Sequence, residues 1–266
     1  MNIKILVAAH KPYWMPPDQC YLPIHVGHQG KADIGFQGDD TGDNISAKNP
    51  HYCELTGLYW AWKNMPQDVE YLGLVHYRRY FTRREVRNVE KRKEQVLTQA
   101  DFEQLLKKAP VIVPGKRRYF IETNRSHYNH AHHTDGLDLA ESIIHEQCPA
   151  YDAAFQTVMN RIWAHMFNMF VMRRDLFDAY CSWLFAILSE LEKRVDITDW
   201  NTYESRIFGF VSERLLDVWL EHNHIDYIEQ NVSFLEPQNW LKKGGIFLKR
   251  KFIPEWGSKE HKEEKG

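Results

Sequence analysis

The sequence predicts an α/β domain with a mostly parallel sheet and helices on both faces. Short apolar runs typical of buried strands alternate with longer segments of helical periodicity. The apolar run at 71–75 ends in His76, Tyr77, Arg78 and Arg79. Ligands of open α/β sheets bind beyond the carboxyl ends of the strands, so this cluster predicts an anion site. The alternative is a strand that emerges into solvent and carries charges for that reason.

The composition is that of an ordinary globular protein. The chain has 266 residues, of which 43% are hydrophobic and 26% charged, and its net charge of −2 gives no sign of a nucleic-acid partner. Its 4 cysteines form no C-x-x-C pair, which argues against structural zinc and a disulfide framework and fits a reducing cytosol. We find no signal peptide or apolar segment of membrane-spanning length. We therefore expect a cytoplasmic protein whose membrane contact, if it has one, is peripheral at the inner face of the cell membrane.

Each element follows from its local pattern. Expected strands lie at 4–9, 71–75, 110–114, 167–172, 225–228 and 232–235. Expected helices lie at 51–64, 101–108, 136–147, 151–163, 175–194 and 203–222, with Asp101 as a helix N-cap. Loops are expected at 27–50, which is rich in Gly, Asp and Asn, and at 115–135, which is long, basic and aromatic. The charged run 82–95 is expected to be a solvated loop or helix face. No repeat or low-complexity linker interrupts the pattern, so residues 1–240 are expected to form a single domain.

The C-terminal tail, residues 241–266, is basic. Between Lys242 and Ile253, lysines and arginines alternate with Ile, Phe and Leu, a pattern that suits an anionic membrane surface. The alternative is a tail that packs on the domain and leaves its lysines in solvent.

Several well-known motifs are absent from the chain. It has no G-x-G-x-x-G, no G-x-x-x-x-G-K-[ST] and no G-x-S-x-G, which disfavours dehydrogenases, P-loop NTPases and α/β-hydrolases. Asp-x-Asp, a pair that many sugar-nucleotide enzymes use to hold a divalent metal on the diphosphate, is also missing. We therefore expect no metal or other cofactor, with arginines neutralising the diphosphate.

Four histidines fall within residues 127–133. They could bind zinc, but the spacing matches no zinc motif and no cysteine joins them. An acceptor-binding or phosphate-binding loop and a merely solvated loop are the other two interpretations.

Taken together, the motifs resemble a known family. They are Val7–Tyr13 (VAAHKPY), Gly42–Ser46 (GDNIS), Glu54–Asn64 (ELTGLYWAWKN), Gly73–Phe81 (GLVHYRRYF), Phe167–Met172 (FNMFVM), Tyr180–Phe185 (YCSWLF) and Arg206–Leu215 (RIFGFVSERL). This combination is similar to a bacterial capsular and exopolysaccharide synthesis family long catalogued as a domain of unknown function, and it spans about residues 3–235. The resemblance implies a glycosyltransferase with a GT-A-like, Rossmann-type fold, a UDP-sugar donor and a lipid-linked or oligosaccharide acceptor. Some members are associated with transfer of galactofuranose, with inversion, in capsule, exopolysaccharide or O-antigen synthesis.

The resemblance also points to individual residues. The matching positions are His10, Lys11, Asp43, Asn44, Ser46, Glu54, Thr56, His76, Tyr77, Arg78, Arg79, Arg206, Gly209, Ser212, Glu213 and Arg214.

We infer roles for some of these positions. Arg78 and Arg79 would hold the diphosphate, and His76 would donate a hydrogen bond to it or to the sugar. For the base that takes the acceptor proton, Glu213 is the first candidate, with Glu204 and Asp199 in reserve.

Other interpretations remain open at this level. Glu213 could form an ion pair with Arg206 or Arg214 that holds its helix in place. The protein could also be a metal-dependent sugar-nucleotide hydrolase, which needs an activated water, or a non-catalytic scaffold of a polysaccharide assembly complex.

Overall fold

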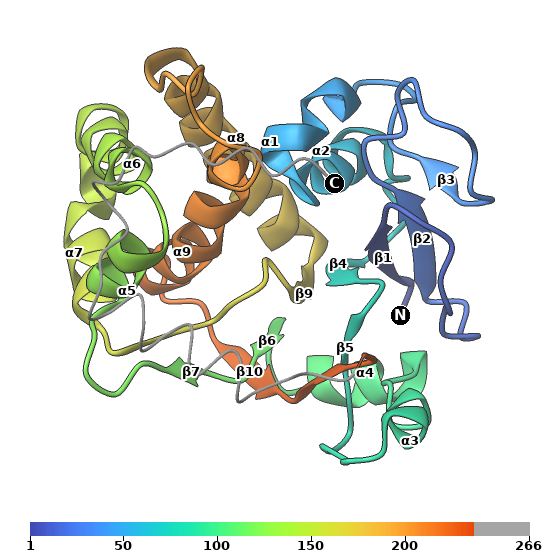
Figure 1. Cartoon of the computed structure of the whole chain (residues 1–266). Helices are drawn as coiled ribbons and strands as arrows, with labels where there is room; N and C mark the ends of the chain where they lie inside the picture. The colour runs from blue at the N-terminus through green and yellow to red at the C-terminus, as the bar shows by residue number, and fades with distance from the viewer. Residues whose placement is uncertain (237–266) are drawn as a thin grey trace, which may run out of the picture.

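The computed structural model describes residues 1–236, so the predicted basic tail at 241–266 lies outside the described residues. The described residues contain a nine-stranded sheet whose main path has the order β10-β6-β9-β4-β1-β2-β3, with β5 and β11 at the side of β4 (Figure 1). Its strands are β1 (Ile3–Ala9), β2 (Tyr21–His25), β3 (Gln37–Gly38), β4 (Tyr71–His76), β5 (Arg79–Phe81), β6 (Val111–Pro114), β9 (Phe170–Arg173), β10 (Tyr227–Gln230) and β11 (Val232–Phe234). A separate pair joins β7 (Arg117–Arg118) to β8 (Trp163–Ala164).

The central strands run parallel, as the sequence predicts. β1 pairs in parallel with β2 and β4, β2 with β3, and β6 with β10. The expected strand at 167–172 is present as β9 but lies antiparallel between β4 and β6, so the sheet is mixed. The close β4–β9 contact requires glycine at position 73, because a Cβ there would come within 2.8 Å of the Phe170 carbonyl oxygen.

Alternate residues of β1 serve two hydrophobic cores. Leu6 and Ala8 face one core, which the large helices cover, while Ile5 and Val7 face the other. This period of two is the signature of a strand buried on both faces. Phe102 of α4 closes the second core, so helices cover both faces of the sheet, as expected.

The helices divide unequally between the two faces. They are α1 (Asn49–Tyr52), α2 (Leu55–Asn64), α3 (Val89–Lys93), α4 (Gln99–Leu106), α5 (Asn124–Ala131), α6 (Thr134–Gln147), α7 (Asp152–Asn160), α8 (Arg174–Arg194) and α9 (Ile207–His222), with 3₁₀ turns at Ser46–Lys48, Pro149–Tyr151 and Glu204–Arg206. Figure 1 shows α6 to α9 gathered on one side and α3 and α4 at the opposite end, near β5.

Three local expectations need correction. The helix expected at 51–64 is broken at Cys53, whose φ of 54° ends α1 and turns the chain before α2 begins. The segment 115–135 is not one long loop, because it contains β7 and α5. Asp101 is not the N-cap of α4: Thr98 is, and the Asp101 carboxylate accepts a hydrogen bond from the Thr98 backbone N–H at 2.8 Å.

Among residues 1–236, no helix combines the length and the apolar character needed to cross a bilayer.

Candidate active site

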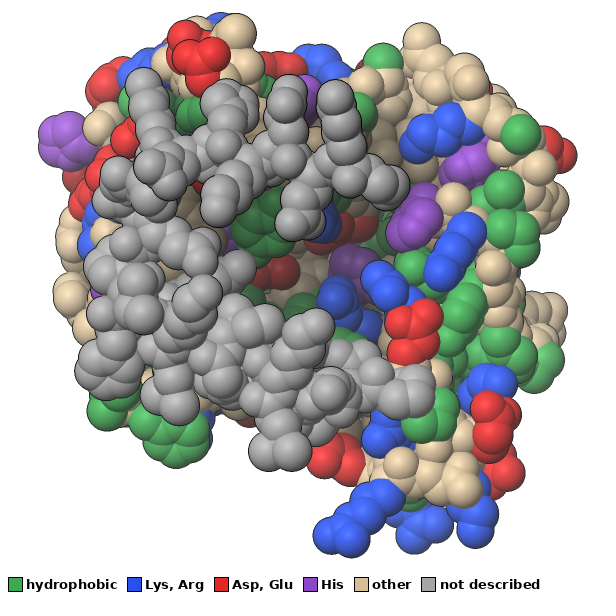
Figure 2. All heavy atoms as spheres, in the orientation of Figure 1, with side chains coloured by type: hydrophobic (Ala, Val, Ile, Leu, Met, Phe, Trp, Pro, Cys, Tyr) green, Lys and Arg blue, Asp and Glu red, His purple; other side chains and the backbone are tan. Residues whose placement is uncertain are grey.

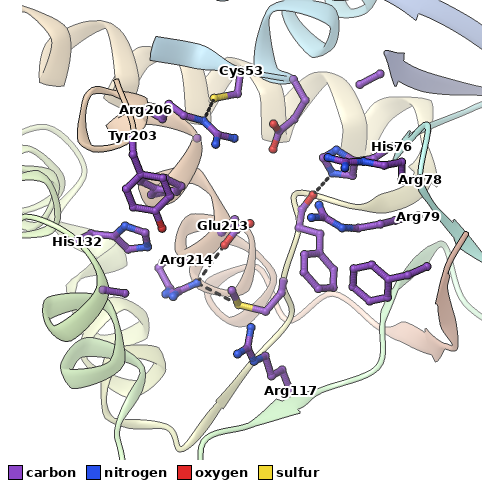
Figure 3. A pocket seen from close by; sticks show the side chains of 18 of the residues that line it. Cys53, His76, Arg78, Arg79, Arg117, His132, Tyr203, Arg206, Glu213 and Arg214 are labelled. Atoms are coloured by element: carbon purple, nitrogen blue, oxygen red, sulfur yellow. Dashed lines mark hydrogen bonds and ion pairs between the residues drawn. The ribbon is translucent and has the colours of Figure 1, made fainter. Parts of the chain in front are cut away.

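A cavity of about 1370 Å³ opens where the parallel strands end. His10 follows β1, Val26 follows β2 and His76 closes β4, and all three line it. The opposite wall comes from α5 and α9, and charged side chains meet in the hollow at the centre of the face shown in Figure 2. Figure 3 shows His76, Arg78 and Arg79 facing Arg206, Tyr203 and His132 across this space, with Glu213 and Arg214 between them. The strand-end position predicted from residues 71–80 is therefore where the cavity lies.

Tyr77 organises the wall at the end of β1. Its buried ring contacts the His10 ring edge-on at 5.2 Å, and the Arg78 guanidinium lies 4.8 Å from its centroid. Arg78 is 42% exposed and its Nη1 pairs with the Glu236 carboxylate at 2.9 Å. Partial burial lowers the pKa of His10, and the positive charges of Arg78, Lys11 and Lys31 lower it further. The electrostatic potential in this part of the cavity is therefore positive.

Arg79 lies deeper than Arg78. Its guanidinium carbon lies 4.7 Å from the Phe167 ring and 5.3 Å from the Phe234 ring, and the two rings contact each other edge-on at 5.7 Å, so the side chain packs against an aromatic pair. Burial lowers the pKa of Arg79, and the nearby carboxylates of Glu213 and Glu54 oppose that shift. An arginine remains charged under such conditions. Arg79 is therefore a fixed cation beside two carboxylates.

The backbone just before β9 is strained and connects the cavity walls. Phe167 and Asn168 have φ of 81° and 51°, a region that costs about 1–3 kcal/mol for residues other than glycine. The Phe167 carbonyl accepts a 2.6 Å hydrogen bond from Nε2 of His76, and the Asn168 amide donates to Glu54 at 2.7 Å and to the Gly209 carbonyl at 3.1 Å. This segment ties the end of β4 to α9.

The contact with Phe167 assigns the tautomer of His76. A carbonyl only accepts, so Nε2 carries the proton, and burial, the main influence, lowers the pKa of the ring. Neutral His76 therefore presents an acceptor nitrogen, Nδ1, and its one N–H is used to hold the strained segment. The role predicted for it, donation to the diphosphate, would require a protonated ring.

Helix α9 supplies the charged groups at the centre of the cavity. The Glu213 side chain is 18% exposed, and its Oε2 lies 3.5 Å from Nη1 of the fully buried Arg214. Nη1 of Arg214 also donates to the Met166 sulfur at 3.1 Å. The expected ion pair of Glu213 is thus present with Arg214, while Nε of Arg206 donates to Cys53 Sγ at 3.0 Å.

Burial raises the pKa of Glu213. The neighbouring Glu54 carboxylate acts in the same direction, while Arg214, Arg79 and a backbone hydrogen bond from Phe167 oppose the shift. A partly buried carboxyl with a raised pKa is suited to taking a proton during a reaction. The ion pair and the role of base are therefore compatible.

The histidines of 127–133 do not form one group. His127 and His130 direct Nδ1 toward the buried Glu122 carboxylate at 3.3 and 2.8 Å. His132 stacks on Phe210 at 3.9 Å, and His133 stacks on Trp200. Among the described residues no three His, Cys, Asp or Glu side chains gather as metal ligands would. The first three of these histidines line the cavity, so this segment forms its far wall.

His127 gives the protein a testable pH dependence. Its pKa is lowered to about 4, first by burial and then by the charges of Arg214 and Arg117, so the unfolded chain binds a proton near pH 6.5 that the folded protein takes up only near pH 4. This contribution to stability is complete above pH 6.5 and is lost as the pH falls toward 4. When the pH is lowered from 7 to 5, we expect protonation linked to His127 to decrease the free energy of unfolding by about 2 kcal/mol, as measured by urea unfolding.

A His127→Gln protein should lose correspondingly less on acidification. His145 provides an opposite control, because its hydrogen bond to Asp152 raises its pKa, so His145→Gln should lose slightly more. Equal losses in the parent and the His127→Gln protein would contradict the assignment.

The structure brings only part of the predicted set to the cavity. His10, Glu54, His76, Tyr77, Arg78, Arg79, Arg206, Gly209, Glu213 and Arg214 line it. Lys11, Asp43, Asn44, Ser46, Thr56, Ser212, Glu204 and Asp199 do not.

Most residues outside the cavity have a structural partner. Ser46 Oγ donates to the buried Asp39 at 2.5 Å, Asp43 accepts from Tyr59 at 3.1 Å, and Thr56 Oγ1 donates to the Cys53 carbonyl at 3.2 Å. Glu204 lies 3.3 Å from His133 Nε2. Neither Glu204 nor Asp199, the reserve candidates for the base, lines the cavity, whereas Glu54 does.

The cavity has an excess of positive charge. Its lining contains Lys31, Arg78, Arg79, Arg117, Arg118, Arg206 and Arg214. The acidic residues in the lining are Glu54, Glu122 and Glu213. Seven cations against three carboxylates favour an anionic ligand with several charges.

Comparison with known proteins places the chain in a family. Residues 4–224 match the family described as Domain of unknown function (DUF4422). The chain belongs to this family. The resemblance predicted from the motifs is thereby confirmed.

One solved structure is similar over most of the chain. The apo structure of the WbbM bifunctional glycosyltransferase has a TM-score of 0.81 and 30% identity to this DUF4422 chain, over 89% of it. The match covers 46% of the WbbM chain, so this protein spans about half of that relative. The predicted α/β, GT-A-like fold class agrees with this likeness. No curated protein sequence matches the chain.

Proposed function

We propose that this DUF4422 protein is a glycosyltransferase that moves galactofuranose, with inversion, from a UDP-sugar to a growing capsular, exopolysaccharide or O-antigen glycan. The observation that carries the proposal is Arg79, a fixed cation at the strand ends, lying beside Glu213, a carboxylate with a raised pKa. The likeness to the WbbM bifunctional glycosyltransferase supports the class of reaction.

Each step of the reaction has a group in the cavity. The acceptor hydroxyl oxygen attacks the anomeric carbon, the bond from that carbon to the β-phosphate oxygen breaks, and its electron pair leaves with UDP. Glu213 takes the hydroxyl proton, and Arg78 and Arg79 stabilise the charge that grows on the diphosphate. Glu54 lies close enough to Glu213 to influence its pKa and is the second candidate for the base. The acceptor, a lipid-linked or free oligosaccharide, would enter along the wall formed by α5 and α9.

We propose that the reaction needs no metal. Arginine forks can neutralise a diphosphate without one, and the cavity has an excess of four positive charges, seven cations less three carboxylates. His10 and Lys31 line the cavity on the side of β1 and β2, and we propose that they contact the nucleotide.

A binding screen tests this proposal. Thermal-shift and calorimetric measurements would use UDP, UDP-galactofuranose, UDP-galactopyranose, UDP-glucose, GDP and CMP sugars, each with and without EDTA. We expect UDP-selective stabilisation of about 2.7 kcal/mol at a ligand concentration of 100 times Kd, unchanged by EDTA and with UDP-galactofuranose as the best donor.

The other outcomes separate the alternatives. Stabilisation that EDTA abolishes would favour the metal-dependent hydrolase and contradict metal-free transfer. No stabilisation by any nucleotide would favour the non-catalytic scaffold.

A further inference from the structure

Three large exposed apolar side chains lie beside the β7–β8 pair, which adjoins the cavity. Apart from Met1, the large apolar side chains exposed among residues 1–236 are Phe120 (80%), Ile121 (70%), Ile162 (45%) and Tyr203 (44%). Phe120 and Tyr203 line the cavity, and the Ile162 carbonyl accepts a 2.8 Å hydrogen bond from the Tyr119 N–H. Phe120 and Ile121 therefore lie in the turn that follows β7, and Ile162 immediately precedes β8; Figure 1 shows β7 near the edge of the molecule. We call residues 116–121 with Ile162 the rim hairpin, after the antiparallel β7–β8 pair, although the two strands are far apart in the sequence.

The rim hairpin is held in a defined conformation. The Tyr119 ring is buried, its hydroxyl donates to the Met166 sulfur at 3.1 Å, and the ring lies 4.0 Å from that of His127. The next residue, Phe120, has φ of 61°, and the Ile121 N–H donates to the Tyr119 carbonyl at 2.7 Å. This is the hydrogen bond of the rare γ-turn with positive φ, which is strained. A strained backbone thus holds two large apolar side chains in solvent, where nothing in the described chain covers them.

Charge on the rim hairpin has one sign. Residues 116–121 contain Lys116, Arg117 and Arg118 and no acidic residue. Lys116 pairs with Glu229 at 2.7 Å, whereas Arg117 and Arg118 are exposed. Aromatic and aliphatic side chains beside unpaired arginines are the combination that inserts into an anionic lipid surface, with the apolar groups among the acyl chains and the cations at the headgroups.

We propose that the rim hairpin docks the protein on an anionic lipid bilayer. Docking would place the cavity mouth, which Arg117, Arg118 and Phe120 help to line, at the headgroup level. The inference does not depend on the transfer reaction, because binding to vesicles is measured without donor or acceptor.

Vesicle co-sedimentation tests the inference with the full chain. The parent protein is expected to bind vesicles of phosphatidylglycerol and phosphatidylcholine at low salt, and to bind pure phosphatidylcholine vesicles much more weakly. Phe120→Ser with Ile121→Ser should weaken binding at least 10-fold, because the insertion of two large apolar side chains is lost. Arg117→Gln with Arg118→Gln should weaken it about 30-fold.

A matched control separates the rim hairpin from net charge. Arg84→Gln with Arg87→Gln removes two exposed arginines elsewhere and should change binding only a few-fold. If the parent does not bind anionic vesicles, or if the rim variants bind as the parent does, the proposal is wrong and another segment accounts for any binding. A parent that sediments as a dimer, and a Phe120→Ser with Ile121→Ser protein that sediments as a monomer, would instead identify the rim hairpin as a contact between copies and overturn the proposal.

Discussion

Replacing Glu213 by Gln is expected to lower kcat for sugar transfer by about 10²- to 10⁴-fold, because the acceptor hydroxyl then loses its general base. The neutral amide has nearly the same shape, so the contact with Arg214 loses charge but not volume. Binding of UDP should persist, since in the proposed mechanism Arg78 and Arg79 on the other wall hold the diphosphate. The measurement is steady-state transfer from the UDP-sugar, with UDP affinity from calorimetry as the check on folding.

The pH dependence of kcat/KM gives a second test of the role of Glu213. Burial raises the pKa of Glu213, so the carboxylate gains a proton at a higher pH than an exposed glutamate would, and kcat/KM of the parent should fall on the acid side of that raised pKa. The acid limb should be absent from the residual activity of Glu213→Gln. Glu204→Gln is the control, because that carboxylate lies outside the cavity beside His133 and should keep near-full turnover. If Glu54→Gln rather than Glu213→Gln abolishes turnover and the acid limb, the base is Glu54.

Replacing Arg79 by Ala is expected to lower kcat/KM by about 10²- to 10³-fold and to weaken UDP binding as well. Arg79 packs against the Phe167 and Phe234 rings, so it can stabilise the leaving diphosphate with little reorganisation. Arg79→Lys should recover only part of the loss, since an ammonium neither stacks on the rings nor offers two parallel donors.

The matched control for Arg79 is Arg84→Ala, an exposed arginine in the segment that follows β5. It should leave kcat/KM and UDP affinity unchanged. The role of Arg79 in holding the diphosphate would be refuted if Arg79→Ala lowered only the melting temperature while kcat/KM and UDP affinity stayed at the parent values.

The parts of the fold with strong periodicity were predictable. β1, β4, α8 and α9 carry uninterrupted apolar patterns, and the structure has each of them near its expected bounds. β2 was missed because Tyr21–His25 is short and contains Pro23, which makes it look like a loop. α5 was missed because Asn, Ser and His are poor helix formers, and its helix depends on the Thr123 cap and the burial of Tyr128. The antiparallel direction of β9 depends on the path of the chain between strands, which a local pattern does not record.

The candidate site was predictable where the residues follow a strand. His10, His76, Arg78 and Arg79 share the strand-end position, and the structure brings them together. Asp43 and Ser46 lie in the segment 27–50 that was expected to be a loop, and Thr56 lies in the first turn of α2; each has a hydrogen-bond partner within the protein. The same residue types would serve a ligand.

The roles of other contributors could not be predicted from the sequence pattern. Cys53, Phe167 and Asn168 act through strained backbone and through contacts with distant residues, neither of which a linear pattern reveals. Arg117 lies in the segment 115–135, whose basic and aromatic composition was the available clue.

The order of elements along the chain has a consequence for biosynthesis. β10 joins the sheet only by pairing with β6, β11 only by pairing with β5, and the cavity takes His10 from the first strand and Glu213 from the last helix. At about 5–20 residues per second, a ribosome would hold the early strands for many seconds before the last partners emerge. During that interval the edge of β6 that pairs with β10 is open, and a chain cut before residue 227 would not complete the sheet.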